Sequence, residues 1–238
     1  MTYNERFDKR KFDETRKIEA KAGVIKNADG SAWFKIGKTE AYAAVYGPRE
    51  VFPKFLQNPE AGILRCHYNM MPFSGSGERV RPGQNRRAKE ISMVTEHALL
   101  PVLDLSAFPN TGVDVFIDLP QTDAGSRCAG ITAAAIALAD AGIPMKDMVA
   151  AVAVGRVDDK VVVDLEYLEE AYEDGPVADI PIAVLHNSKK ISLLQMDGEI
   201  SKEMLMEALR LGQKTAEKIH EVQKKALQSK YSEAGDEQ

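Results

Sequence analysis

The stretch QTDAGSRCAGITAAAIALADAGIP, residues 121–144, joins a polar turn to a long run of small residues. It overlaps the end of an apolar segment, residues 113–122, that predicts a strand. The small residues predict a helix over about 127–141, which Gly142 and Pro144 end. Side chains as small as alanine let a helix lie close to a sheet, so we expect this helix to pack tightly in the core.

The rest of the chain alternates strands and helices. Strands are predicted within residues 17–48 and 63–73, a helix within 88–103, hairpins within 148–165 and 178–198, and a last helix over about 202–227. This order indicates an α+β domain over residues 1–227, with helices packed on mixed sheets in two intimately packed ββαβα-like halves. The second half is expected to begin near residue 113. Residues 228–238 predict a flexible acidic tail.

Composition and charge are those of an ordinary folded protein. Of the 238 residues, 44% are hydrophobic and 28% are charged, and the formal net charge of −5 argues against indiscriminate nucleic-acid binding. Cys66 and Cys128 lie far apart without a CxxC pair, so neither a zinc site nor a disulfide framework is predicted. Residues 1–17 contain no apolar targeting segment, and no apolar run is long enough for a membrane span. We therefore expect a cytoplasmic protein without a membrane partner.

The tripeptide Gly125-Ser126-Arg127 lies between the predicted strand and the predicted helix. Free backbone N–H groups at a helix N-terminus form an anion site, which a hydroxyl and a guanidinium can complete. A capped helix whose arginine reaches solvent explains the same spacing equally well. The residues alone therefore leave a phosphate site and a plain helix start as equal alternatives.

A second cluster, residues 78–90, is basic. Arg86 and Arg87 stand at the start of a predicted helix, and Arg79 and Arg81 precede them. Guanidinium groups can hold phosphodiesters through two hydrogen bonds each, so this track suits single-stranded RNA. A solvated surface loop is the alternative, and the spacing alone favours that loop.

Asp179 leads an otherwise apolar predicted strand that follows the acidic segment 164–174. A carboxylate in such a position commonly does no more than cap a turn. Beside arginines and a phosphate, however, it becomes a candidate general acid or magnesium ligand. Glu173 and Asp174 precede it closely enough to share the metal, although most acids of this segment are expected to be solvated.

Taken in order, these motifs resemble the RNase PH family, and more closely its catalytic branch in the archaeal exosome. The similar segments are residues 16–50, 64–74, 81–92, 114–145, 174–184 and 193–201. Within them, YGPRE (46–50), YNMMPFS (68–74) and ALADAGIPM (137–145) point to the exosome branch. The resemblance covers about residues 6–227 and implies an RNase PH-type fold.

The resemblance also implies a reaction. Inorganic phosphate, as co-substrate, would attack the 3′ end of single-stranded RNA and release nucleoside 5′-diphosphates in the 3′ to 5′ direction. The implied roles are phosphate binding by Gly125, Ser126 and Arg127, RNA binding by Arg86, Arg87, Arg79 and Arg81, catalysis by Asp179, and a candidate Mg²⁺ site at Asp179, Asp174 and Glu173.

The implied partners are a homologous inactive subunit, alternating with this chain in a six-membered ring, and RNA-binding cap subunits. In that ring, residues 47–62 are expected to face the pore. Ser126 stands where the family commonly has threonine. Bacterial relatives carry a second aspartate six residues before the catalytic one, where this chain has Glu173, with Asp174 one position off. The alternatives are a homohexameric RNase PH that trims transfer-RNA 3′ ends and a non-catalytic RNA-binding ring subunit.

Overall fold

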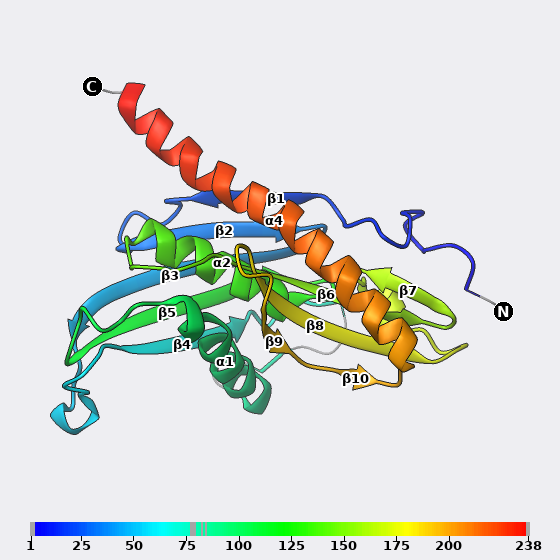
Figure 1. Ribbon diagram of the computed structural model, residues 1–238, viewed down its shortest axis with the longest axis horizontal. Coiled ribbons are helices and arrows are strands. Elements are labelled where there is room, and N and C mark those ends of the chain that lie inside the picture. The colour runs from blue at the N-terminus through cyan, green and yellow to red at the C-terminus, as the bar shows by residue number, and fades with distance from the viewer. Residues whose placement is uncertain (1–2, 77–79, 82, 84, 237–238) are drawn as a thin grey trace.

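The computed structural model describes residues 3–76, 80–81, 83 and 85–236. The strands are β1 (Ile18–Ala22), β2 (Gly30–Ile36), β3 (Thr39–Glu50), β4 (Ile63–Met70), β5 (Thr111–Gln121), β6 (Val149–Val157), β7 (Lys160–Val163), β8 (Val177–Leu185), β9 (Ile191–Leu194) and β10 (Asp197–Gly198). The α-helices are α1 (Arg86–Leu99), α2 (Ser126–Asp140), α3 (Tyr167–Glu170) and α4 (Lys202–Asp236), with short 3-10 helices at Lys54–Leu56 and Leu100–Val102. This mixture confirms the predicted α+β class (Figure 1).

The strands form two sheets. The first has the order β1-β2-β3-β5-β4, in which β4 and β5 are parallel and the other pairs are antiparallel. The second has the order β10-β8-β6-β7, with β9 added to β8, and all its pairs are antiparallel. The first sheet is therefore mixed and the second is antiparallel, and helices pack against both (Figure 1).

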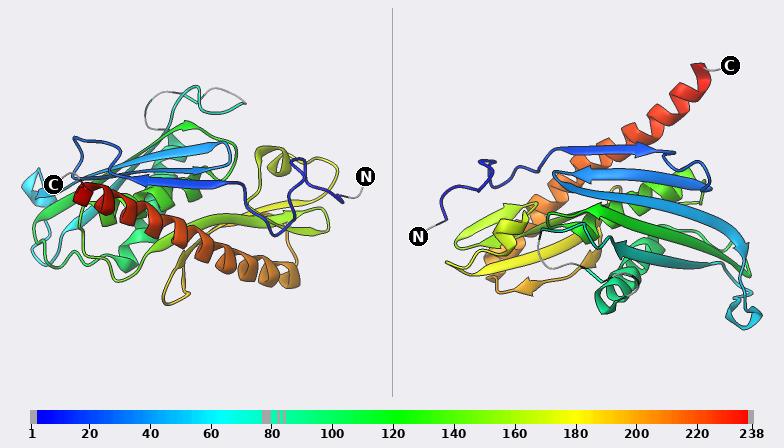
Figure 2. Two further views of the ribbon diagram at one scale, coloured as in Figure 1. Left: turned by 90° about the horizontal axis from the view of Figure 1, so that it is seen from above. Right: turned by 180° about the vertical axis from the view of Figure 1, so that it is seen from behind.

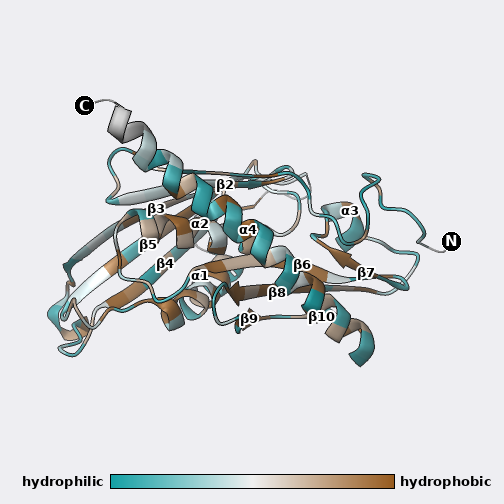
Figure 3. Ribbon diagram, turned by 45° about the horizontal axis from the view of Figure 1, so that its top comes forward, coloured by the Kyte–Doolittle hydropathy of each residue, from teal (hydrophilic) through white to brown (hydrophobic). Residues whose placement is uncertain are grey.

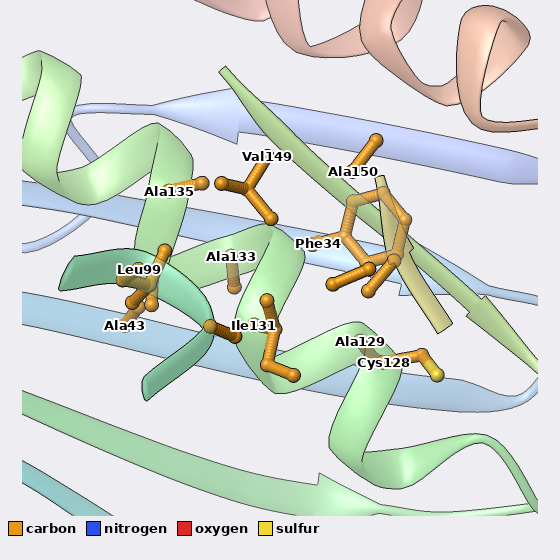
Figure 4. Close-up of a cluster of buried hydrophobic side chains, with 14 of the residues drawn as sticks. Phe34, Ala43, Leu99, Cys128, Ala129, Ile131, Ala133, Ala135, Val149 and Ala150 are labelled. Atoms are coloured by element: carbon orange, nitrogen blue, oxygen red, sulfur yellow. The ribbon is translucent and has the colours of Figure 1, made fainter. Parts of the chain in front are cut away.

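Helix α2 lies between the two sheets. It packs against β2 and β3 of the first sheet and against β6 of the second, and nearly all of its fifteen residues are buried. Figure 4 shows Ala133 of α2 among side chains that include Phe34 of β2 and Val149 of β6. At Gly30 of β2 an added Cβ would lie 2.2 Å from the backbone nitrogen of Ala141, so larger residues would separate strand and helix. The prediction of tight helix–sheet packing is confirmed.

The other helices cover the outside. Helix α1 packs on β4 and β9, while α4 crosses β1, β6, β7 and β8 diagonally (Figure 1). Figure 3 shows that α4 is largely hydrophilic, whereas β6 and β8 beneath it are largely hydrophobic, as expected for a surface helix on a buried sheet. Among the described residues, no helix combines the length and the apolar character that crossing a membrane requires.

The structure differs from the sequence prediction at two boundaries. The second half does not begin near residue 113, because β5 lies within the first sheet between β3 and β4, and the second sheet begins with β6 at Val149. Residues 228–238 were expected to form a flexible tail, but α4 continues to Asp236, and its last turns extend past β1 (Figure 2). Lys230 anchors this extension, since its Nζ lies 2.6 Å from Oδ1 of the buried Asp140.

A buried ion pair joins the N-terminal arm to the second sheet. Arg6 is 2% exposed, and its Nη2 lies 2.7 Å from Oε2 of the fully buried Glu169 on α3. The same guanidinium also donates to the backbone carbonyls of Val163 and Asp164, each at 2.8 Å. Because these hydrogen bonds satisfy the arginine, its burial is tolerated and α3 is held in a fixed position.

Candidate active site

A cleft of about 1160 Å³ lies where the two sheets meet at the N-terminal end of α2. Its walls come from α1, from the turn before α2, from α3 and from β8 and β10. The sequence-predicted site residues that line it are Arg81, Arg86, Arg87, Gly125, Ser126, Arg127 and Asp179. Segments almost one hundred residues apart in the chain therefore contribute to one cavity. Arg79 lies outside the described residues.

The turn before α2 lines the cleft and has an unusual backbone conformation. Gly125, the N-cap of α2, has φ 62° and ψ 19°, and Ala124 has φ 58°. Thr39 holds the turn, because its Oγ1 donates to the Ala124 carbonyl and accepts from the Asp123 N–H, both at 2.8 Å. The first N–H groups of a helix lack intrahelical partners, so this turn has the form of an anion site.

Arg127 turns toward the cleft from the first turn of α2. Its side chain is 21% exposed, its Nη1 donates to Oε1 of Gln195, and the same nitrogen lies 3.9 Å from Oε1 of Glu90. These contacts place the guanidinium among cleft residues, whereas a plain helix start would let it extend into solvent. The geometry therefore favours the anion-site interpretation of Gly125-Ser126-Arg127.

Arg86 and Arg87 open helix α1 on the opposite wall. The helix begins where expected, because the Asn85 side chain caps it by accepting from the Ala88 N–H at 2.8 Å. Both arginines are exposed at the cleft. Burial raises the pKa of the Asp179 carboxyl, and the charge of Arg87 opposes part of that rise, so this guanidinium lies close enough to the acid to act on it.

Asp179 lies on β8 between β6 and β10, opposite Gly155 and Asp197. Its Oδ1 is buried and has no hydrogen-bond partner among the described residues. Burial raises the pKa of Asp179 to about 6, an effect that Arg127 and Arg87 oppose and Asp197 reinforces. The carboxyl is therefore poised to hold or release a proton near neutral pH, as a general acid must.

A second cleft carboxylate, Glu170 at the end of α3, was not predicted from the sequence. Burial and the neighbouring Asp179 raise its pKa to about 7, while Arg87 and a hydrogen bond from the Gly125 backbone oppose the rise. Glu173 and Asp174 instead are exposed and do not line the cleft. No local sequence signal marks Glu170, because it faces the cleft only once Arg6 has fixed the neighbouring Glu169 in the core.

The carboxylates of the cleft fit a magnesium ion only in part. Among the described residues, no group of three or more His, Cys, Asp or Glu side chains is arranged to hold a metal. Mg²⁺, however, is usually bound by one or two carboxylates together with substrate phosphates. Asp179, with its unpartnered buried Oδ1, and Glu170 meet that requirement beside the candidate anion site.

Comparison with known proteins agrees with this arrangement. Residues 14–144 match domain 1 of the RNase PH 3′ exoribonuclease family, and residues 147–215 match domain 2. The division between these domains falls just before β6, where the second sheet begins. Rice Rrp46 shares the fold with a TM-score of 0.82 at 24% identity, over 94% of this chain and 100% of that chain.

Relatives at higher identity carry the name exosome complex component Rrp41. The Thermococcus kodakarensis protein is 52% identical over 95% of this chain and 89% of its own length. The Nitrosopumilus maritimus protein is 47% identical over 95% and 91% respectively. A structure described as the Archaeoglobus fulgidus exosome with RNA bound to the active site matches with a TM-score of 0.77 at 25% identity, over 92% of both chains. The chain belongs to the RNase PH family of 3′ exoribonucleases.

Proposed function

We propose that this chain is the catalytic subunit of an archaeal-type exosome and degrades single-stranded RNA from its 3′ end by phosphorolysis. The observation that carries the proposal is one cleft containing an anion-binding turn, two helix-opening arginines and a buried acid with a raised pKa. The relatives named Rrp41 and the exosome structure with RNA support it. A purely scaffolding subunit would not require this combination of groups.

Binding places two phosphate groups side by side. Inorganic phosphate, the co-substrate, occupies the N-terminal turn of α2, where the backbone N–H groups, the Ser126 hydroxyl and Arg127 bind its oxygens. Arg86 and Arg87 bind the last phosphodiesters of the RNA, and Arg81 extends this basic wall. The arginines also neutralise the repulsion between the two phosphates, which would otherwise oppose their approach.

In the reaction, an oxygen of inorganic phosphate attacks the phosphorus of the terminal phosphodiester. The bond from that phosphorus to the 3′ oxygen of the preceding nucleotide breaks, and Asp179 donates a proton to this leaving oxygen. The products are a nucleoside 5′-diphosphate and an RNA that is one residue shorter and ends in a 3′ hydroxyl. Because phosphate replaces water as the nucleophile, the reaction is phosphorolysis and not hydrolysis.

We propose Mg²⁺ as a cofactor, held by Glu170 together with substrate phosphates, in place of the set of Asp179, Asp174 and Glu173 expected from the sequence. Asp179 is then left to hold the proton that the leaving oxygen receives. The ion would neutralise charge on the phosphates as the transition state forms. Glu170, whose pKa lies at about 7 because of burial and the nearby Asp179, would ionise fully when the cation is present.

The proposed partners are a homologous inactive subunit that alternates with this chain in a six-membered ring, and RNA-binding cap subunits. Residues 47–62 support a neighbouring subunit, since Phe52 and Phe55 in this loop are each 83% exposed. Aromatic side chains exposed to this degree are typical of surfaces that another chain covers. We place this loop at the pore side of the ring.

The test is to incubate the assembled ring with single-stranded RNA in the presence and absence of phosphate. Nucleoside diphosphates should form only when phosphate is present, whereas release of monophosphates would contradict phosphorolysis. Asp179→Asn should abolish release and leave RNA binding largely intact. Asp174→Asn is the matched control, because this exposed carboxylate lies outside the cleft and its loss should leave the rate unchanged.

A further inference from the structure

The side-chain amide of Gln195 connects Arg127 to Glu90 beside the proposed anion site. Its Oε1 accepts from Arg127 Nη1, and its Nε2 lies 3.2 Å from Oε1 of Glu90. The carboxylate oxygen of Glu90 is also 3.9 Å from Arg127 Nη1. One amide therefore stands between a cation on α2 and an anion on α1.

Gln195 lies in the second half of the chain, in the connection between two strands of the second sheet, although both of its side-chain partners belong to the first half. It lies between β9 and β10, and its backbone N–H donates to the carbonyl of Pro181 on β8 at 3.1 Å. Asp197, two residues later, pairs with Asp179 across β10 and β8. The position of Arg127 is therefore tied to the strand that carries the catalytic acid.

The orientation of the amide follows from electrostatics. Only the oxygen can accept from a guanidinium, and only the nitrogen can donate to a carboxylate, so the amide cannot rotate by half a turn without losing both bonds. Glu90 is 46% exposed and carries a negative charge near the atoms that would bind phosphate. It offsets part of the Arg127 charge and repels an incoming anion.

We infer that Gln195 and Glu90 are positioning residues that set the affinity of the site for inorganic phosphate in opposite directions. Gln195 aims the Arg127 guanidinium at the turn before α2 and so raises the affinity. Glu90 competes with phosphate for the same guanidinium and so lowers it. This inference rests on the proposed function, because it assigns inorganic phosphate to the anion site.

The test measures the dissociation constant of inorganic phosphate by titration calorimetry on the assembled ring, and the KM for phosphate and kcat with RNA. Glu90→Gln should lower the dissociation constant and the KM by about 2- to 5-fold, the effect expected of a half-exposed charge pair. Gln195→Leu should raise the dissociation constant and the KM by about 10- to 100-fold, as expected for the loss of a hydrogen bond to a charged group, with a smaller change in kcat. Glu221→Gln, an equal charge change on α4 away from the cleft, should change neither.

Opposite effects of the two substitutions distinguish this role from a structural one, since damage to the fold would weaken phosphate binding in both variants. The gain in Glu90→Gln should also shrink as ionic strength rises, because salt screens half-exposed charges. Unchanged or weaker binding in Glu90→Gln, or a Gln195→Leu variant that binds phosphate as the wild type does, overturns the inference. If the wild-type ring binds phosphate but releases no diphosphates, the proposed function fails while the order of dissociation constants still decides the inference.

Discussion

Replacing Asp179 by asparagine should stabilise the folded chain while it removes catalysis. Burial raises the pKa of Asp179 from 3.8 to about 6, so at pH 7 the folded chain contains a carboxylate whose ionised form is disfavoured. If the unfolded chain titrates near the ordinary value, this ionisation lowers the free energy of unfolding at pH 7 by up to about 3 kcal/mol. Asparagine has a similar shape and no charge, so the variant avoids this loss.

The sign of the pH dependence is fixed by the two pKa values. Below about pH 3.8 both the folded and the unfolded chain hold the proton, and the contribution of Asp179 to stability is fully present. It is lost as the pH rises from there through about 6, and it stays constant above. The advantage of Asp179→Asn should therefore be close to zero well below pH 3.8 and largest above pH 6.

Urea denaturation of the full-length chain in the presence of a chelator measures this effect. We expect a gain of about 1–3 kcal/mol at pH 7.5, equivalent to a rise in Tm of roughly 2–10 °C for a chain of this size. Asp174→Asn is the control and should show no such gain, since Asp174 is exposed. An asparagine variant that is no more stable at pH 7.5, or a gain that does not vary with pH, would refute the reasoning.

Three further substitutions test the framework around the site. Arg6→Met leaves Glu169 as an uncompensated buried charge and should lower the free energy of unfolding by about 3–5 kcal/mol in chemical denaturation. A much smaller decrease would mean that water enters and solvates Glu169. Gly125→Ala should lower the free energy of unfolding by about 1–2 kcal/mol, because alanine is strained in the left-handed backbone conformation (φ 62°). The added Cβ itself would make only ordinary contacts, so no further cost is expected. An unchanged denaturation midpoint would mean that the turn relaxes. Lys230→Met should accelerate amide exchange in the last described turns of α4, and unchanged exchange would show that the contact with Asp140 does not hold them.

Local sequence signals predicted the elements better than their arrangement. Gly142 and Pro144 ended α2 close to the expected position, and arginines at the start of a helical pattern marked α1. The placement of β5 was wrong because its partners are distant: it lies antiparallel to β3 and parallel to β4, and periodicity carries no information about pairing. The end of α4 depends on Lys230 and Asp140, ninety residues apart, which no local pattern reveals.

The same limit applies to the site. The arginines at 86, 87 and 127 and Asp179 were found because each stands at a helix or strand start, and the family resemblance brought them together. Glu170 was missed because the direction of its side chain depends on the buried pair between Arg6 and Glu169, which lie 163 positions apart in the sequence. Spacing from Asp179 pointed to Glu173 instead, which the structure leaves exposed.

The position of α2 between the two sheets has a consequence for how the site can be lost. Its N-terminal turn supplies the proposed anion site, while its other faces are covered by β2 and β3 on one side and by β6 on the other. Undocking the second sheet would expose the helix and remove Asp179, Glu170 and Gln195 from the cleft in a single event. Phosphate bound at this turn favours the docked state, whereas a protease cuts the segment between residues 144 and 149 in the undocked state. Phosphate should therefore protect this segment from proteolysis.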